Sequence, residues 1–164
     1  MTLKTLLKEL DLNSVPFLFY ILMKNTLIAI ILFTPFTMVA QGITGKWNTV
    51  DDNTGEVRST VEIYLKDNKA FGKVVAITDP QQQDALCEKC EDKDPRKNQK
   101  ILGMEIIKGL KKSGKEWING EILDPENGKV YKCKIWLENG SLVVRGYLGF
   151  TWLGRSQTWI RSPK

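Results

Sequence analysis

The segment 120–161 restricts the fold of this chain more than any other, because its turn residues divide it into short strands. Asn139-Gly140 is a strong signal for a tight β-hairpin, since a type I′ turn needs positive φ at both central residues. Runs rich in β-branched and aromatic residues flank this dipeptide at 130–137 and 142–150. A second turn sequence at 124–128 contains Pro, Asn and Gly. The segment therefore predicts an antiparallel meander.

The chain upstream continues this pattern, most clearly at 57–66, where apolar and polar residues alternate with the period of a half-buried strand. We expect an all-β fold in which most strands are joined by short turns. An eight-stranded antiparallel up-and-down barrel is favoured, because closure removes exposed strand edges. An open β-sandwich is the alternative. The expected strands are 43–50, 57–66, 71–78, 101–110, 117–123, 129–137, 142–150 and 155–161.

Residues 1–40 have the pattern of a leader with a secretory signal peptide. Met23-Lys24-Asn25 precedes a short apolar run at 27–33, and cleavage is expected after Ala40. The run is shorter than the roughly 18–20 residues that span a bilayer, so we expect no transmembrane anchor after cleavage. We interpret Met23 as the true start; a longer leader with two apolar segments is the alternative. The remaining residues, 41–164, predict a single periplasmic or secreted domain.

The chain contains no histidine. This excludes Ser-His-Asp and Cys-His nucleophile arrangements and most zinc-enzyme sites, so we expect no enzyme, no catalytic residues, no cofactor and no metal. The leader carries three of the 24 basic residues and two of the 19 acidic ones, which leaves 21 against 17. This small, interspersed excess does not suggest a nucleic-acid partner.

A polar stretch at 79–100 interrupts the strand pattern and predicts a long loop. It contains Cys87 and Cys90, and in an exported protein a disulfide that clamps the loop is the simplest interpretation. A redox pair, a metal site and free thiols are the alternatives. Cys133 alternates in step with apolar neighbours and is expected to be a small buried residue.

Five residues are candidates for ligand binding: Trp47, Arg145, Tyr147, Trp152 and Trp159. Aromatic side chains can form the wall of a cavity for an apolar ligand, although they also fill cores and favour strands. Trp152 is expected in a loop at the barrel mouth. Arg145 would hold a carboxylate or phosphate head group if it faces inward, because its planar fork binds both oxygens. The alternative for Arg145 is an exposed cross-strand ion pair.

Two resemblances add to these predictions. Gly45-Lys46-Trp47 resembles the Gly-x-Trp signature of lipocalins, which implies that Trp47 closes the barrel floor beneath Arg155 or Arg161 near the last strand. A second set of motifs extends over nearly all of the chain after the leader: Gly45-x-Trp47, Cys87-x-x-Cys90, Gly103, Trp117-x-x-Gly120, Asp124-Pro125-x-x-Gly128-Lys129-x-Tyr131, Arg145-Gly146-Tyr147-x-Gly149 and Gly154-Arg155-x-Gln157-x-Trp159. With these motifs the chain resembles the bacterial family called domain of unknown function 2147. The resemblance implies a small exported protein with a lipocalin-like barrel, and no established activity.

Two functions follow as hypotheses. The first is an exported barrel that binds a small apolar or anionic amphipathic ligand. The second is a structural or envelope-stress protein with a filled barrel, which acts through an unidentified protein partner. The turn at 124–128 contains oxygen ligands of the kind that calcium prefers, but ordinary turn chemistry accounts for its composition.

Overall fold

The computed structural model describes residues 42–163. The predicted leader at 1–40, its suggested start at Met23 and the expected cleavage after Ala40 lie outside the described residues. Residues Gln41–Lys164 form a compact unit of their own. This unit contains every strand of the sheet and the whole described core. Within 42–163 the structure contains no helix that is long and apolar enough to cross a membrane.

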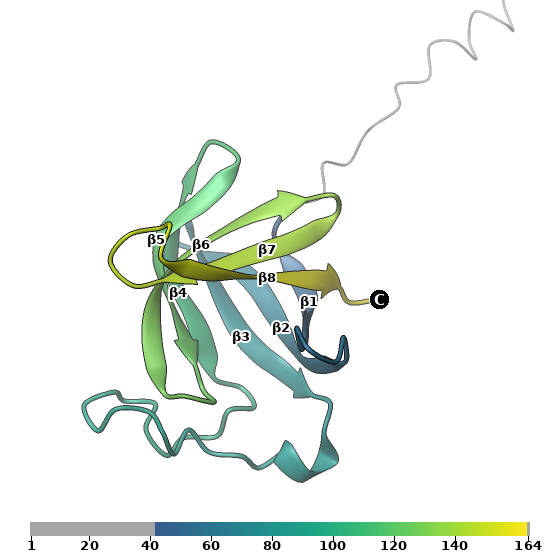
Figure 1. The fold of residues 1–164 in the computed structure, drawn as a ribbon, viewed down its shortest axis with the longest axis vertical. Coiled ribbons are helices and arrows are strands. Elements are labelled where there is room, and N and C mark those ends of the chain that lie inside the picture. The colour runs from purple at the N-terminus through teal and green to yellow at the C-terminus, as the bar shows by residue number, and fades with distance from the viewer. Residues whose placement is uncertain (1–41, 164) are drawn as a thin grey trace, which may run out of the picture. The chain divides into compact units, whose positions relative to one another are not determined.

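Eight antiparallel strands form one closed barrel (Figure 1). Each strand pairs with the next, and β1 closes the barrel against β8 through Trp47 opposite Arg161 and Asn48 opposite Ile160. The predicted up-and-down barrel is therefore confirmed, and this closure excludes the open sandwich. The strands are β1 (Gly45–Val50), β2 (Val57–Lys66), β3 (Lys69–Ile77), β4 (Glu105–Ser113), β5 (Glu116–Asp124), β6 (Lys129–Glu138), β7 (Ser141–Tyr147) and β8 (Gly154–Arg161).

Several strand boundaries differ from the prediction, and at two of them the strand is clearly shorter than expected. β4 begins at Glu105 rather than at residue 101, since Ile101 donates its backbone N–H to Ala85 across the long loop. β7 ends at Tyr147 rather than at residue 150, and Gly149 with φ +69° turns the chain away from the sheet. Positive φ suits glycine, which has no Cβ to clash with the backbone.

The barrel has a filled end and an open end. Hairpin turns at 67–68, 114–115 and 139–140 lie at the filled end, where the inward-facing side chains are buried. Connections 51–56, 78–104, 125–128 and 148–153 lie at the open end. Figure 1 shows the long β3–β4 loop extending below this end of the barrel. The inward residues of the filled half include Trp47, Val61, Ile63, Ile107, Leu110, Ile135 and Leu142, each at most 1 % exposed.

Trp47 and Arg161 close the filled end. The Trp47 indole is fully buried and donates its N–H to the Ile43 carbonyl at 2.8 Å. The Arg161 guanidinium carbon lies 4.1 Å from the centroid of the Trp47 ring, a cation–π contact. The same guanidinium donates to the carbonyls of Gly42 (2.9 Å) and Thr44 (3.3 Å). Of the two arginines suggested by the lipocalin resemblance, Arg161 is the one that covers Trp47.

Arg161→Met is expected to lower the free energy of unfolding by about 1–2 kcal/mol, because it removes a cation–π contact and two charge-assisted hydrogen bonds. Arg155→Met is the matched control. Arg155 is exposed and pairs with Asp52 at the open end, so its loss is expected to cost less than about 1 kcal/mol. Urea unfolding followed by tryptophan fluorescence measures both variants. Equal effects of the two substitutions would contradict this account of the floor.

Candidate functional site

The open half of the barrel contains a cavity of about 1610 Å³. Its deepest described wall is formed by Trp159 of β8 and Val144 of β7, which lie above the filled core. Other strands contribute further apolar side chains to the lining: Val57, Val74, Ile77, Ile106 and Ile122. The volume exceeds that of a typical small-molecule site, roughly 300–1,000 Å³, because the cavity opens widely at the mouth.

Neutral polar groups are interspersed along this wall. Thr49 and Ser59 face the cavity from neighbouring strands, and their hydroxyl oxygens lie 2.8 Å apart. Gln157 lies one inward position above Trp159 on β8, 3.4 Å from the indole nitrogen. Tyr131 contributes a phenol whose oxygen accepts from the Asn127 side chain at 3.1 Å. These groups could orient a ligand through neutral hydrogen bonds.

Charged lining residues lie at the rim. The carboxylates are Asp51, Asp52, Glu56, Asp79, Asp124 and Glu126, and the cations are Arg58, Lys89 and Arg155. Arg58 reaches from β2 to Glu126 on the β5–β6 turn and also pairs with Asp51 at 3.4 Å. The cavity lining at the rim thus carries more carboxylates than cations, which does not favour a ligand with an anionic head group inside the barrel.

The β5–β6 turn at the rim uses its polar side chains internally. Asp124 accepts hydrogen bonds from the Glu126 backbone N–H (2.9 Å) and the Asn127 amide (2.8 Å), and Asn127 accepts from the Lys129 N–H (2.8 Å). Among residues 42–163, no group of three His, Cys, Asp or Glu side chains is placed to hold a metal ion. The turn chemistry explains the composition of 124–128 without a cation.

Gly146 leaves space in the upper wall. It lies on β7 opposite Cys133 and Arg155, and its missing side chain would point into the cavity. A Cβ at this position would meet Tyr131 at 3.5 Å and Ile122 at 3.6 Å, which is ordinary van der Waals contact. The glycine thus widens the cavity, although neither its backbone angles nor its close neighbours require one.

The sequence matches a family model over residues 45–161, and this model is described as "Uncharacterized protein conserved in bacteria (DUF2147)". The chain belongs to the DUF2147 family. The match covers the barrel from the first residue of β1 to the last of β8. No curated protein matches the sequence significantly.

One solved structure similar to this DUF2147 chain supports its lipocalin-like fold. Protein HP1028 from Helicobacter pylori, described as belonging to the lipocalin family, superposes with a TM-score of 0.65 at 16 % identity. The match covers 75 % of this chain and 84 % of that one. A point mutant of the fluorescent protein UnaG also matches, with a TM-score of 0.43 at 16 % identity over 74 % of this chain and 97 % of that one. At these identities the likeness to HP1028 concerns the fold alone.

Two of the five predicted ligand-binding residues line the cavity. Trp159, which is 2 % exposed, lies at its inner end, and Trp152, which is 71 % exposed, lies at its rim in the β7–β8 loop. Trp47 is inward-facing but lies deeper, in the filled half beneath Arg161. The structure therefore places Trp47 in the barrel floor, as the lipocalin resemblance implied, and away from the cavity wall.

Arg145 and Tyr147, which were predicted as ligand contacts, do not line the cavity. Val144 and Gly146 line the cavity, so the alternating residues Arg145 and Tyr147 face the outside of the barrel. The Arg145 guanidinium donates to three neutral oxygens, the carbonyls of Thr151 (2.8 Å) and Trp152 (3.3 Å) and the Ser156 hydroxyl (2.8 Å). Arg145 thus fixes the β7–β8 loop, and the reason for expecting an anionic head group inside the barrel is removed.

The structure contains the predicted disulfide between Cys87 and Cys90. Both residues are buried, at 0 % and 1 % exposure, because the loop that carries them folds back onto the barrel. Lys89 and Ala85 of this loop, together with Ile101, form part of the cavity wall. Cys133 is a free, buried thiol, as expected, and burial raises its pKa to about 12. It therefore stays protonated, and a protonated thiol is a poor nucleophile.

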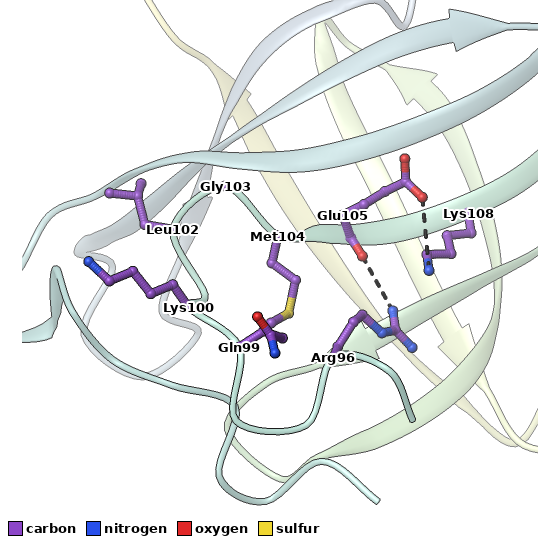
Figure 2. A pocket seen from close by; sticks show the side chains of 8 residues that line it. All are labelled: Arg96, Gln99, Lys100, Leu102, Gly103, Met104, Glu105 and Lys108. Atoms are coloured by element: carbon purple, nitrogen blue, oxygen red, sulfur yellow. Dashed lines mark hydrogen bonds and ion pairs between the residues drawn. The ribbon is translucent and has the colours of Figure 1, made fainter. Parts of the chain in front are cut away.

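A smaller, shallow pocket of about 320 Å³ lies where the long loop meets β4 (Figure 2). Arg96 is committed to its neighbours there: it pairs with Asp94 at 2.6 Å and donates to the Glu105 carbonyl at 3.3 Å. Hydrogen bonding from Arg96 lowers the pKa of Asp94 to about 2, so the pair stays ionised at physiological pH. Lys108 approaches the Glu105 carboxylate at 4.0 Å. These contacts attach the long loop to β4, so the polar residues of this pocket have a structural role.

Sequence reasoning missed most of the neutral cavity wall, including Thr49, Ser59, Ile122 and Gln157. A signal for part of it exists. Gln157 lies two residues before Trp159 and shares its face of the strand, so an inward Trp159 implies an inward Gln157. Ser59 lies likewise in the alternating series with Val57 and Val61.

Proposed function

We propose that this protein is an exported, non-enzymatic binding protein that holds one small apolar or amphipathic molecule in the open half of its barrel. The cavity of about 1610 Å³ is the observation that carries this proposal. An eight-stranded barrel can hold one small ligand or be filled by its own side chains, and here the half above Trp159 is open.

The wall supports a ligand with an apolar body and a neutral polar group. Apolar side chains surround the inner cavity, while Thr49, Ser59 and Gln157 offer hydroxyl and amide groups. A charged group on the ligand would have to remain at the rim, because burying an unpaired charge costs several kcal/mol. Fatty alcohols, monoacylglycerols and similar neutral amphiphiles fit this pattern.

The alternative function, a filled barrel that acts only through a protein partner, has less support. It requires side chains to occupy the barrel interior, and they do so only in the half that contains Trp47 and Leu142. Export is proposed from the signal-peptide pattern at 1–40. A disulfide in the described domain is compatible with an oxidising compartment.

Native mass spectrometry of residues 41–164, purified after export and without detergent, tests this proposal. The expected result is a reproducible extra mass that disappears on organic extraction and identifies the ligand class. Trp159 at the inner end of the cavity should report re-binding through its fluorescence when neutral amphiphiles are titrated in. A bare mass with no fluorescence response to any of these amphiphiles would contradict ligand binding.

A further inference from the structure

The β7–β8 loop, residues 148–153, presents an apolar surface at the cavity mouth. Of the seven large hydrophobic side chains that are exposed in the described chain, four lie on this loop: Leu148 (59 %), Phe150 (66 %), Trp152 (71 %) and Leu153 (55 %). The rings of Phe150 and Trp152 stack with their centroids 6.0 Å apart. A contiguous exposed apolar patch of this kind marks an interaction site.

The loop backbone is already hydrogen-bonded within the protein. Arg145 donates to the carbonyls of Thr151 and Trp152, and the Leu153 N–H donates to the Phe150 carbonyl at 3.1 Å. Three successive carbonyls at the tip thus have partners that are not water. A loop entering an apolar medium needs such partners, because unsatisfied backbone groups are costly there. The apolar side chains project from a tip that is fixed from beneath by Arg145.

The charge of the surrounding strands is strongly asymmetric. Residues 129–163 contain six basic residues and one acidic residue, Glu138, whereas residues 42–128 contain 14 basic and 16 acidic ones. On the outer face beside the loop, Lys132 lies opposite Tyr147 and Lys134 lies opposite Arg145. Lys134 pairs with Glu116 at 2.9 Å, and Glu121 lies opposite Lys132 on β5, so the positive excess of this face is small. It complements a surface that carries anionic head groups.

We propose that the β7–β8 loop docks onto a phospholipid bilayer that contains anionic lipids. Phe150 and Trp152 would enter the interfacial region, where aromatic side chains are favoured. Lys132 and Arg145 would lie on the side facing the head groups. The β1–β2 turn, which adjoins the loop on its other side through the Arg155–Asp52 pair, carries the carboxylates Asp51, Asp52 and Glu56. Anionic head groups repel this side, so the docked barrel tilts its β6–β7 side, with Lys132, towards the lipid.

Docking would place the cavity mouth at the membrane. Leu148, Trp152 and Leu153 line both the loop surface and the cavity rim, so the two apolar surfaces are continuous. An amphipathic molecule could then pass between the bilayer and the barrel without crossing water. The proposal that the loop docks onto a bilayer depends only on the properties of the loop. The transfer of a ligand between bilayer and barrel rests, in addition, on the proposed function.

Flotation of residues 41–164 with vesicles tests the docking. We expect binding to vesicles of equal parts phosphatidylcholine and phosphatidylglycerol, weaker binding to phosphatidylcholine alone, and a decrease as salt is raised. The double variant Phe150→Ser with Trp152→Ser should lower the partition coefficient by roughly tenfold or more, since it removes the inserting side chains. Leu65→Ser is the matched control, because Leu65 is an equally apolar residue, 50 % exposed, at the filled end of the barrel.

Three outcomes would overturn the docking: no binding to either vesicle, equal loss of binding in the Leu65 control, or self-association that disappears in the double variant, which would mean that a second copy covers the loop. Sedimentation velocity without vesicles measures the last. The double variant leaves the inner cavity intact, so its binding of a soluble neutral amphiphile reports separately on the proposed function. A wild-type protein that binds the amphiphile but neither vesicle would refute the docking alone.

Discussion

Gly146→Phe is expected to lower ligand affinity by about tenfold or more, equivalent to about 1.4 kcal/mol, without destabilising the barrel. Gly146 lies in the upper cavity wall, where a Cβ would meet only Tyr131 and Ile122, at ordinary contact distances. A phenyl ring built from this position would extend into the cavity and obstruct the path towards Trp159. Stability should stay equal or rise slightly, since glycine within a strand costs roughly 0.5–1 kcal/mol and aromatic residues favour strands.

Thr158→Phe is the matched control, because Thr158 is exposed on the outer face of the neighbouring strand, β8. Titration of a fluorescent neutral amphiphile measures affinity, and urea unfolding measures stability. The combination of lower affinity with unchanged stability would place the ligand in the cavity. Unchanged affinity in Gly146→Phe would place any bound molecule elsewhere on the protein and would contradict the proposed site.

The fold could be predicted from sequence because its signals are local. Asn139-Gly140 and the alternation at 57–66 each specify a hairpin or a strand within about ten residues. Closure then follows from the number of strands and the need to remove edges. The boundaries of β4 and β7 could not be predicted, since the contacts that end these strands come from Ala85 and from the fold of the β7–β8 loop.

The site could be predicted less well, because the alternation of residues along a strand defines two faces but does not show which of them points into the barrel. On β7, Leu142, Val143, Val144 and Tyr147 are all buried, so both faces of this strand are apolar and Arg145 could belong to either. The partners of Arg145 are the carbonyls of Thr151 and Trp152 in the β7–β8 loop, and this contact has no local sequence signal. The sequence also does not show how deep in the barrel an inward side chain lies. Trp47 and Trp159 both face inward, and only the register of the closed barrel places Trp47 in the floor and Trp159 in the cavity wall.

Gly128→Ala is expected to lower the free energy of unfolding by about 3 kcal/mol or more, and to expose the disulfide loop. Gly128 has φ +74°, which strains any residue with a Cβ. A Cβ there would also lie 1.8 Å from the Lys89 carbonyl oxygen and 2.6 Å from the Cys90 nitrogen. Because both of these are backbone atoms, no rotamer change can relieve the clash, and the loop must move away from the β5–β6 turn.

Gly55→Ala is the control that separates the cost of backbone strain from the cost of the steric clash at Gly128. Gly55 has the same φ, +74°, in another turn at the open end, but its Cβ would meet nothing within 4 Å. This control should therefore cost only the backbone strain, about 1–2 kcal/mol. Urea unfolding gives the two free energies, and the rate of disulfide reduction by a phosphine reports on the loop, since Cys87 and Cys90 are buried when it is docked. Equal destabilisation and equally slow reduction in both variants would contradict the contact between Gly128 and Lys89.

Gly128→Ala also tests whether the disulfide loop contributes to ligand binding. Lys89, Ala85 and Ile101 form part of the cavity wall, and the short separation of Cys87 and Cys90 keeps the intervening backbone in the shape that packs on Gly128. If the loop leaves the barrel, the cavity loses this wall and its mouth widens. Gly128→Ala should therefore weaken amphiphile binding, whereas Gly55→Ala should retain it in the folded protein. If the disulfide of the Gly128→Ala protein is reduced quickly but the protein binds the amphiphile with normal affinity, the loop wall contributes nothing to ligand affinity.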